Sequence, residues 1–342
     1  MERRPTIVDV ARQAGVSKGL VSLALNDRPG VNQVTKERIQ AAAAEIGWRP
    51  NPAARSLTSR RAYALGLVVK RDPRIIETDP FFAAFIAGLE TVLADRGQVL
   101  VLSVVPDPGA EERAYRSLAA DGRVDGFILT DLLRHDRRIA LLAELGVRGV
   151  TLGEPDVPTT LPAVRREYEH GIDELVRYLA DLGHERIAHV AGNEDMLHGR
   201  ARREQFERVA ADLGVDAHVV PTDFSPEQGA EATRRLLTLA PEVRPTAIVY
   251  GNDPMAVAGM AVAQGAGLRI PDDLSVTGLD GSQIGQYVYP ALTTLDNDPV
   301  EWGRVVASTL LDLVDGNDPV DRTLTPARLI VRGSTGAPAP RP

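Results

Sequence analysis

From residue 63 onward, short runs of apolar, largely β-branched residues alternate with longer segments that carry apolar residues at helical spacing. Continuous apolar strands separated by helices of ten or more residues predict parallel sheets with helices on both faces. Strands are predicted at 65–69, 99–104, 126–130, 149–152, 187–191, 218–220, 246–250, 275–279, 292–295 and 324–331. Helices are predicted at 80–96, 110–121, 137–145, 172–182, 200–213, 226–239, 254–266 and 300–314. This pattern predicts an α/β body of two doubly wound lobes.

The first fifty residues have a different, purely helical pattern, and residues 6–25 predict two short helices joined by a tight turn. Thr6 and Asp9 have the spacing of a capping box. Gly15 favours a left-handed end to the first helix, and Ser17 is placed to cap the second. The residues expected to face inward are Ile7, Val10, Ala11, Ala14, Val21, Ala24 and Leu25. This arrangement predicts a helix-turn-helix.

The outward face of the second helix suits the major groove of DNA. Lysine and asparagine can reach phosphates or base edges, glycine allows close approach, and an exposed leucine can contact a thymine methyl group. The residues predicted to contact DNA in this part of the chain are Thr6, Ser17, Lys18, Gly19, Ser22, Leu23 and Asn26. Taken alone, the pattern fits equally well a small helical subdomain that does not bind DNA.

The residues that follow favour DNA binding. A third helix is predicted from Asn32 to Gly47, with Trp48 packing back on the first two. A further helix of about seven residues is then expected, because Asn51 can cap it and a proline follows at the first helical position. So short a helix is marginal in water, and we expect it to fold on DNA, where Leu57 would enter the minor groove. The residues predicted to contact DNA from this segment are Asn51, Ala54, Arg55 and Leu57.

The runs TIVDVARQAGVSKGLVSLALN and RPNPAARSL resemble the lactose-repressor (LacI/GalR) family of transcription regulators, and the resemblance extends over nearly the whole chain. It implies that Lys18, Gly19 and Leu23 read bases and that Leu57 is the hinge leucine. It also implies a body like the periplasmic binding proteins. The expected parts are a head at 1–49, a hinge at 50–61, a body at 62–336 and a flexible tail at 337–342. Lobe 1 is expected at about 62–163 and 293–322, and lobe 2 at about 164–292 and 323–336.

The charge of the chain is divided unevenly between head and body. Residues 1–61 carry eleven Lys and Arg against five Asp and Glu, whereas the remainder carries 28 against 42. A basic head on an acidic body directs phosphate binding to the head. The chain has no cysteine, which excludes disulfides and thiolate sites. No apolar leader or membrane-length apolar run occurs, so we expect a cytoplasmic protein with no membrane partner.

Polar and aromatic side chains follow several predicted strands, at the sheet edge where parallel sheets bind ligands. Each alone fits a structural role such as core packing, a surface ion pair or a helix cap. Together they resemble the family's effector pocket, in which aromatic faces stack on a ring and polar groups bind hydroxyls or a base edge. The predicted effector-binding residues are Phe81, Phe82, Asp131, His198, Arg202, Phe224, Asn252 and Asp280. Departures from the family pattern at Arg166-Glu167, Gln205-Phe206 and His198 leave the ligand open.

Two motifs point to enzymes but stand in the wrong context. The run GVSKG matches a serine-hydrolase elbow, yet a helix precedes it where that motif needs a strand. In HERIAH the histidines are five residues apart, not four, and the segment reads as a strand and not as a zinc-binding helix. No catalytic residue, metal site or cofactor is therefore predicted.

These observations predict a homodimeric repressor whose operator affinity is set by a small molecule, a sugar or a sugar derivative. Two heads on a twofold axis would read a pseudopalindrome. The C-terminal run RGSTGAPAPRP has no leucine heptads, which predicts a dimer without a tetramerisation helix. Two alternatives remain: a regulator of purine-repressor type that needs a corepressor, and a sugar-processing enzyme or solute-binding protein that carries a helical head.

Overall fold

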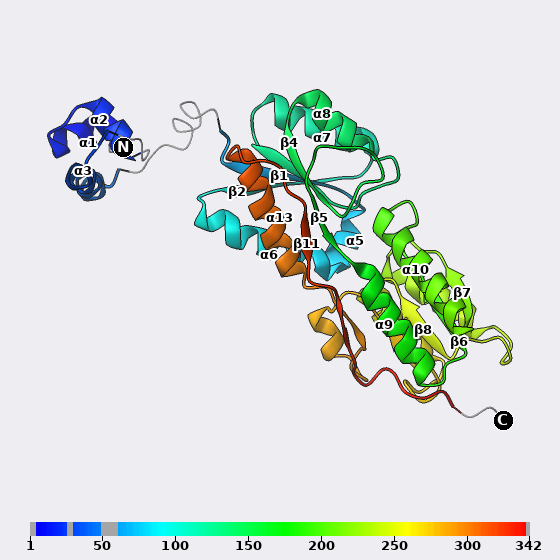
Figure 1. Cartoon of the computed structure of the whole chain (residues 1–342). Helices are drawn as coiled ribbons and strands as arrows, with labels where there is room; N and C mark the ends of the chain where they lie inside the picture. Colours follow the sequence, from blue (N-terminus) through cyan, green and yellow to red (C-terminus); the bar gives the residue numbers. More distant parts are fainter. Residues whose placement is uncertain (1–4, 26–29, 49–60, 340–342) are drawn as a thin grey trace. The chain divides into compact units, whose positions relative to one another are not determined.

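The computed structural model describes residues 5–25, 30–48 and 61–339, and it divides into two units, Met1–Ala62 and Tyr63–Pro342 (Figure 1). The expected hinge at 50–61 lies almost entirely outside the described residues, together with Asn26, Asn51, Ala54, Arg55 and Leu57. Within the described ranges, no helix is long and apolar enough to cross a membrane. The two units are described separately below.

The smaller unit is built from three helices around an apolar centre. They are α1 (Ile7–Ala14), α2 (Lys18–Leu25) and α3 (Gln33–Glu45). The backbone N–H and the hydroxyl of Thr6 both donate to the Asp9 carboxylate, at 2.8 and 2.7 Å, and Gly15 ends α1 with φ +65°. The buried residues are Val10, Ala11, Ala14, Val21, Ala24, Ile39, Ala42 and Ala43, and Trp48 packs against them. The predicted helix-turn-helix and third helix are confirmed.

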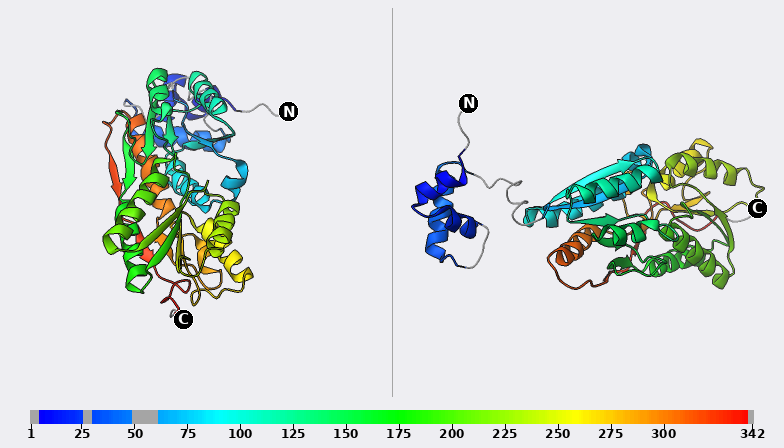
Figure 2. Two further views of the ribbon diagram at one scale, coloured as in Figure 1. Left: turned by 90° about the vertical axis from the view of Figure 1, so that its right-hand side faces the viewer. Right: turned by 90° about the horizontal axis from the view of Figure 1, so that it is seen from above.

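The first sheet of the larger unit is six-stranded and parallel, with the order β11-β5-β4-β3-β1-β2. Its strands are β1 (Ala64–Lys70), β2 (Val99–Val105), β3 (Gly126–Leu129), β4 (Arg148–Leu152), β5 (Ala163–Arg166) and β11 (Arg322–Leu324). The helices of this lobe are α5 (Pro73–Thr78), α6 (Pro80–Asp95), α7 (Pro108–Ala120), α8 (Arg137–Leu145) and α13 (Pro299–Val314). Figure 2 shows helices on both faces of the sheet, as the continuous apolar strands predict.

The second sheet is four-stranded and parallel, with the order β7-β6-β8-β9. Its strands are β6 (Arg186–Val190), β7 (Asp216–Val220), β8 (Ala247–Tyr250) and β9 (Ser275–Thr277). The helices of this lobe are α9 (Tyr168–Asp181), α10 (Leu197–Leu213), α11 (Pro226–Leu237), α12 (Asp253–Gly265) and the 3-10 helix η1 (Gln283–Gln286). The predicted two-lobed α/β body is confirmed.

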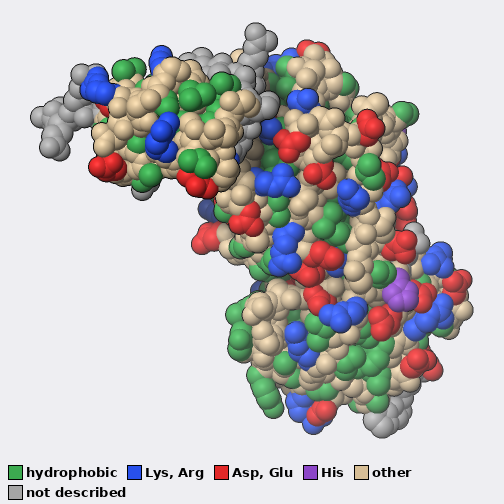
Figure 3. All heavy atoms as spheres, turned by 60° about the vertical axis from the view of Figure 1, so that its left-hand side comes forward, with side chains coloured by type: hydrophobic (Ala, Val, Ile, Leu, Met, Phe, Trp, Pro, Cys, Tyr) green, Lys and Arg blue, Asp and Glu red, His purple; other side chains and the backbone are tan. Residues whose placement is uncertain are grey.

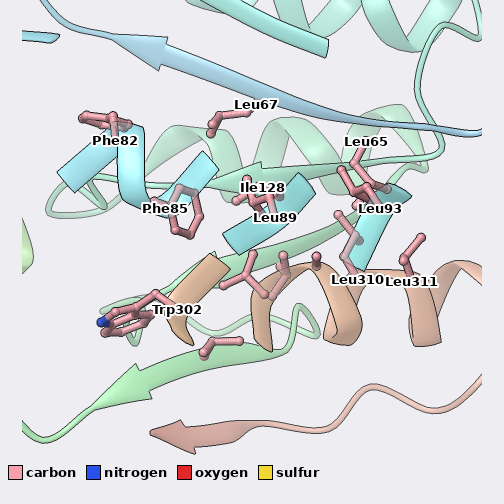
Figure 4. Close-up of a cluster of buried hydrophobic side chains, with 14 of the residues drawn as sticks. Leu65, Leu67, Phe82, Phe85, Leu89, Leu93, Ile128, Trp302, Leu310 and Leu311 are labelled. Carbon is pink, nitrogen blue, oxygen red and sulfur yellow. The ribbon is translucent and has the colours of Figure 1, made fainter. Parts of the chain in front are cut away.

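Helices α6 and α13 pack tightly against each other over the first sheet (Figure 4). A Cβ atom at Gly88 of α6 would lie 2.2 Å from the Val300 carbonyl oxygen, and one at Gly303 of α13 would lie 2.2 Å from the Phe85 carbonyl oxygen. Only glycine permits this approach. Trp302 is fully buried at the edge of the same cluster, so α13 anchors the C-terminal part of the chain in the first lobe.

The structure corrects the expected connections between the lobes. The run at 324–331 is two short strands: β11 joins the six-stranded sheet, and β12 (Arg328–Ile330) pairs with β10 (Thr294–Asp296) in a separate antiparallel sheet. The run at 292–295 therefore does not enter the first lobe. Strand β5, which was not predicted, places Ala163–Arg166 in the first sheet. The chain therefore passes from the first lobe to the second a few residues later than expected. Strands this short carry too few residues for a clear periodicity.

Candidate functional site

The start of helix α2 presents the predicted DNA-contacting residues at the surface. Lys18 and Gly19 are exposed, whereas Ser22 and Leu23 are half-buried. The Ser17 hydroxyl accepts a hydrogen bond from the Leu20 N–H at 3.2 Å and so caps the helix, as expected. A Cβ atom at Gly19 would meet nothing closer than 3.9 Å, so internal packing does not require glycine there. A missing side chain on an exposed helix face instead lets another surface approach closely.

A cavity lies in the larger unit at the carboxyl ends of both parallel sheets. It encloses about 80 Å³. Seven of the eight predicted effector-binding residues line it: Phe81, Asp131, His198, Arg202, Phe224, Asn252 and Asp280. Five further lining residues were not predicted: Arg71, Asp79, Leu152, Gly153 and Trp302. Both lobes contribute, because the loops after β1, β3 and β4 meet those after β7, β8 and β9.

Phe82 does not line the cavity, which corrects its assignment as an effector-binding residue. Its side chain is 3% exposed and belongs to the core of the first lobe. Successive residues of a helix point about 100° apart, so Phe81 and Phe82 cannot both face the same space. The Phe82 ring instead lies beneath the guanidinium carbon of Arg71, 5.1 Å from it.

Arg71 follows β1 and forms the ionic centre of the cavity wall. Its Nε and Nη2 atoms each donate to the Asp131 carboxylate at 2.7 Å, and Nη1 donates to Asp79 at 2.9 Å. Burial alone would raise the pKa of Asp131, but the charge and hydrogen bonds of Arg71 outweigh it and hold that pKa below its usual range. Burial dominates at Asp79, whose pKa is raised. The guanidinium also lies 5.9 Å from the Phe224 ring of the other lobe.

Two acidic residues form a second polar group in the second lobe. The Asp253 N–H donates to Asp280 at 2.9 Å, and Asp253 itself accepts from the backbone and hydroxyl of Ser282, both at 2.7 Å, and from Thr294 at 2.7 Å. Burial and then the neighbouring Asp253 charge raise the pKa of Asp280 to about 8. A carboxyl that keeps its proton at neutral pH can both donate and accept hydrogen bonds, which suits a hydroxyl group.

An aromatic wall stands beside these carboxyls. The rings of His198 and Phe224 are stacked, with centroids 5.5 Å apart and planes 21° apart. Burial, followed by the Arg202 charge, lowers the pKa of His198 to about 3, so this ring is neutral. A Cβ atom at Gly192 would lie 1.8 Å from the Phe224 ring, so this ring lies directly on the backbone. The wall is thus held in place before any ligand binds.

Asn252 lines the cavity, but its amide is engaged within the protein. Its Oδ1 accepts from the Met255 N–H at 2.9 Å, which caps α12, and its Nδ2 donates to the Phe224 carbonyl at 2.9 Å. Through these two hydrogen bonds Asn252 also holds Phe224 in position. Arg202 similarly anchors α10 to the end of β8 through a 2.8 Å hydrogen bond to the Gly251 carbonyl.

Sequence patterns could have indicated some, but not all, of the cavity-lining residues that were not predicted. Arg71 directly follows an apolar strand, and Asp79 caps helix α6, so both stand where ligand-binding residues are usual. Trp302 lies within the apolar pattern of α13 and gives no such signal. His184 and His189, in the motif that resembles a zinc site, each make hydrogen bonds within the protein, and His189 lies on strand β6 as predicted.

Comparisons with known proteins agree with this architecture. Residues 6–51 match the model of bacterial regulatory proteins of the lacI family, and residues 176–335 match the periplasmic binding protein-like domain. The chain is 34% identical to the transcriptional regulator CelR of Thermobifida fusca, over 96% of both chains. It is 31% identical to the transcriptional repressor CytR of Escherichia coli K12, over 98% of both. The chain belongs to the lacI family.

Solved structures of the family resemble this one along almost the whole chain. The lac repressor dimer bound to operator is 27% identical with a TM-score of 0.83, and the match covers 98% of this chain and all of that one. A complex of CelR with cellobiose is 31% identical with a TM-score of 0.74, and the match covers 97% of this chain and all of that one. This lacI-family protein is a DNA-binding transcriptional regulator.

Proposed function

We propose that this chain is a repressor that binds a pseudopalindromic operator as a homodimer and leaves it when a sugar or a sugar derivative occupies the cleft. The observation that carries the proposal is the composition of the cavity. Carboxyl groups and arginines, which bind hydroxyls, surround a space with fixed aromatic faces, against which a sugar ring can pack. The solved complex of a CelR regulator with cellobiose, 31% identical to this chain, supports the sugar class.

We infer that sugar binding lowers operator affinity through a change in the angle between the lobes. The cavity of about 80 Å³ is smaller than the several hundred Å³ of most ligand sites, so a sugar enters only if the lobes separate or its wall rearranges. Arg71 and Asp131 come from one lobe, and Phe224 and Asp280 from the other. A ligand that touches both lobes selects one angle between them. That angle sets the spacing of the two hinge segments of the dimer, and with it operator affinity.

Exposed apolar side chains support the dimer. Val99, Leu102 and Val104 lie on β2, an edge strand of the first sheet, and are between 40 and 56% exposed. Next to η1 in the second lobe, Tyr287 and Tyr289 are 76% and 89% exposed. Figure 3 shows hydrophobic side chains gathered toward the lower end of one face of the body. Large exposed apolar surfaces mark interaction sites, and a second copy of the chain would cover these.

The proposal is tested with operator DNA selected from a random pool by the purified protein. Fluorescence anisotropy should give a salt-dependent affinity that a matching sugar lowers. A purine base that strengthens binding would instead support the corepressor alternative. Arg202→Met is expected to weaken the sugar response and to leave binding without sugar unchanged. Turnover of the sugar, followed by NMR, would favour the enzyme alternative.

The assembly is tested separately by light scattering on the full chain. We expect a dimer, and Leu102→Arg should shift it toward a monomer, because a charge would be buried on the apolar edge strand. Arg116→Ala, a change at an exposed residue of α7, is the control and should remain dimeric. A tetramer, or a dimer that is insensitive to Leu102→Arg, would contradict the proposed interface. As a transcriptional regulator, the protein would work in the cytoplasm, where its operator DNA lies.

A further inference from the structure

Two buried nitrogen atoms at the wall of the cleft have no hydrogen-bond partner within the part of the chain that the structure describes: Nε1 of Trp302 and Nε of Arg166. The Trp302 side chain is 1% exposed and the Arg166 side chain 2%. An unpaired buried N–H is costly, and in native proteins such groups usually find a partner in the protein, in water or in a ligand. These two donors therefore mark positions where an acceptor atom of a ligand would be bound most favourably.

The two donors belong to one structural unit. The guanidinium carbon of Arg166, at the end of β5, lies 5.6 Å from the centre of the Trp302 ring, in the first turns of α13. The Nη2 atom of Arg166 donates to the Glu301 carboxylate at 2.6 Å and so fixes the guanidinium over the indole. Figure 4 shows the indole nitrogen at the end of the apolar cluster, directed away from the other labelled side chains.

The Arg166–Trp302 pair stands where two hollows meet. Trp302 lines the cavity of about 80 Å³, and Arg166 lines a neighbouring open groove of about 910 Å³. Leu152, Gly153 and His198 line both, so the two spaces are adjacent. A groove of this size lies within the range of ligand sites. When the lobes separate to admit a ligand, a ligand held in the cavity would extend past the pair into the groove.

The groove is polar and its charges are balanced. Arg165 and Glu154 pair across 2.9 Å, and Arg200 and Glu204 pair across 2.6 Å. Paired charges of this kind offer hydrogen bonds to a hydroxylated ligand without favouring an anion or a cation.

We propose that the effector is an uncharged oligosaccharide of at least two rings, with one ring in the cavity and the next in the groove. Trp302 donates from Nε1 at the wall of the cavity and Arg166 donates from Nε in the groove, and the contact with Arg166 distinguishes an oligosaccharide from a monosaccharide. This inference rests on the proposed function, in which a sugar binds the cleft.

Tryptophan fluorescence gives a direct test. The chain has two tryptophans, so in a Trp48→Phe protein the emission comes from Trp302 alone. This protein is titrated with glucose, galactose, cellobiose, maltose, lactose and cellotriose, and calorimetry gives the affinities. We expect at least one disaccharide or trisaccharide to change the Trp302 emission and to bind at least about tenfold more tightly than either monosaccharide.

Variants test whether the higher affinity for an oligosaccharide comes from the two donors. Arg166→Met should weaken the oligosaccharide about five- to tenfold and leave a monosaccharide unaffected, because one charged hydrogen bond is lost. Arg166→Lys keeps the charge opposite Glu301 but lacks the Nε donor, so it should show the same loss in a protein of unchanged fold. Trp302→Phe, measured by calorimetry, should weaken the oligosaccharide about fivefold. Arg177→Met, an exposed ion-paired residue of α9, is the matched control and should change neither affinity.

The possible outcomes distinguish between the proposed function and the subsite, that is, the second-ring site in the groove next to Arg166 and Trp302. Equal affinities for monosaccharides and oligosaccharides, or equal losses for both in Arg166→Lys, would overturn the subsite while leaving a sugar-responsive repressor. Binding of no saccharide at all would overturn both the subsite and the sugar class. Retention of the full oligosaccharide preference in both Arg166→Lys and Trp302→Phe would overturn the assignment of the two donors.

Discussion

Replacing Arg71 by methionine would remove the cation that two buried carboxylates share. The three hydrogen bonds from Arg71 to Asp79 and Asp131 are 2.7 to 2.9 Å long, and the three side chains are 8%, 12% and 17% exposed. Loss of one partner from a buried ion pair costs about 3–5 kcal/mol of folding free energy. We therefore expect Arg71→Met to lower the free energy of unfolding at pH 8 by an amount of that order.

The loss should depend on pH with a definite sign. Without Arg71, burial and mutual repulsion would raise the folded-state pKa of Asp79 and Asp131 above the unfolded value. A group of this kind destabilises the folded state progressively as the pH rises from its unfolded to its folded pKa. The cost of the substitution should therefore be smaller at pH 5 than at pH 8, by about 1–2 kcal/mol, because one pKa unit corresponds to about 1.4 kcal/mol.

Urea unfolding provides the assay. In a Trp48→Phe protein the fluorescence follows Trp302 in the larger unit alone. Arg116→Met is the matched control: Arg116 also donates three hydrogen bonds to two carboxylates, at 2.8 to 3.3 Å, but all three side chains are exposed. It should have a far smaller effect at either pH, since solvent screens exposed pairs. A cost for Arg71→Met that matches the control, or that is the same at pH 5 and pH 8, would refute this account of the cavity.

Three further predictions concern ligand and operator. If a protonated Asp280 donates to the ligand, as the proposed function implies, sugar affinity should fall as the pH rises through about 8, and Asp280→Asn should remove this dependence in calorimetric titrations at pH 6 to 9. Gly192→Ala should weaken sugar binding at least about tenfold by displacing the Phe224 ring, whereas Gly265→Ala, where an added Cβ meets nothing within 4 Å, should bind normally. Leu57→Ala should lose operator affinity and keep sugar affinity; unchanged operator binding in a gel shift would exclude the minor-groove wedge.

The larger share of the architecture could be predicted from local patterns. Helical periodicity with a capping residue and a terminal glycine located α1 to α3, and continuous apolar runs located the long strands of both sheets. Polar residues after those strands pointed to the cavity, because the carboxyl ends of parallel strands meet at one edge. Phe82 was misassigned because sequence adjacency does not show which face of a helix points inward. The two hydrogen bonds that hold Asn252 within the protein also cannot be read from the chain, because its partners are distant or depend on the fold.

The sequence by itself determined the helix-turn-helix, the α/β body and the edge at which the ligand site lies, because these follow from side-chain periodicity and from signals a few residues apart. Only the tertiary structure decided which groups share the site. Arg71 meets Asp131 sixty residues later, and Arg166 meets Glu301 and Trp302 across more than 130 residues. Such pairs are selected by packing and charge in three dimensions, so no local pattern records them.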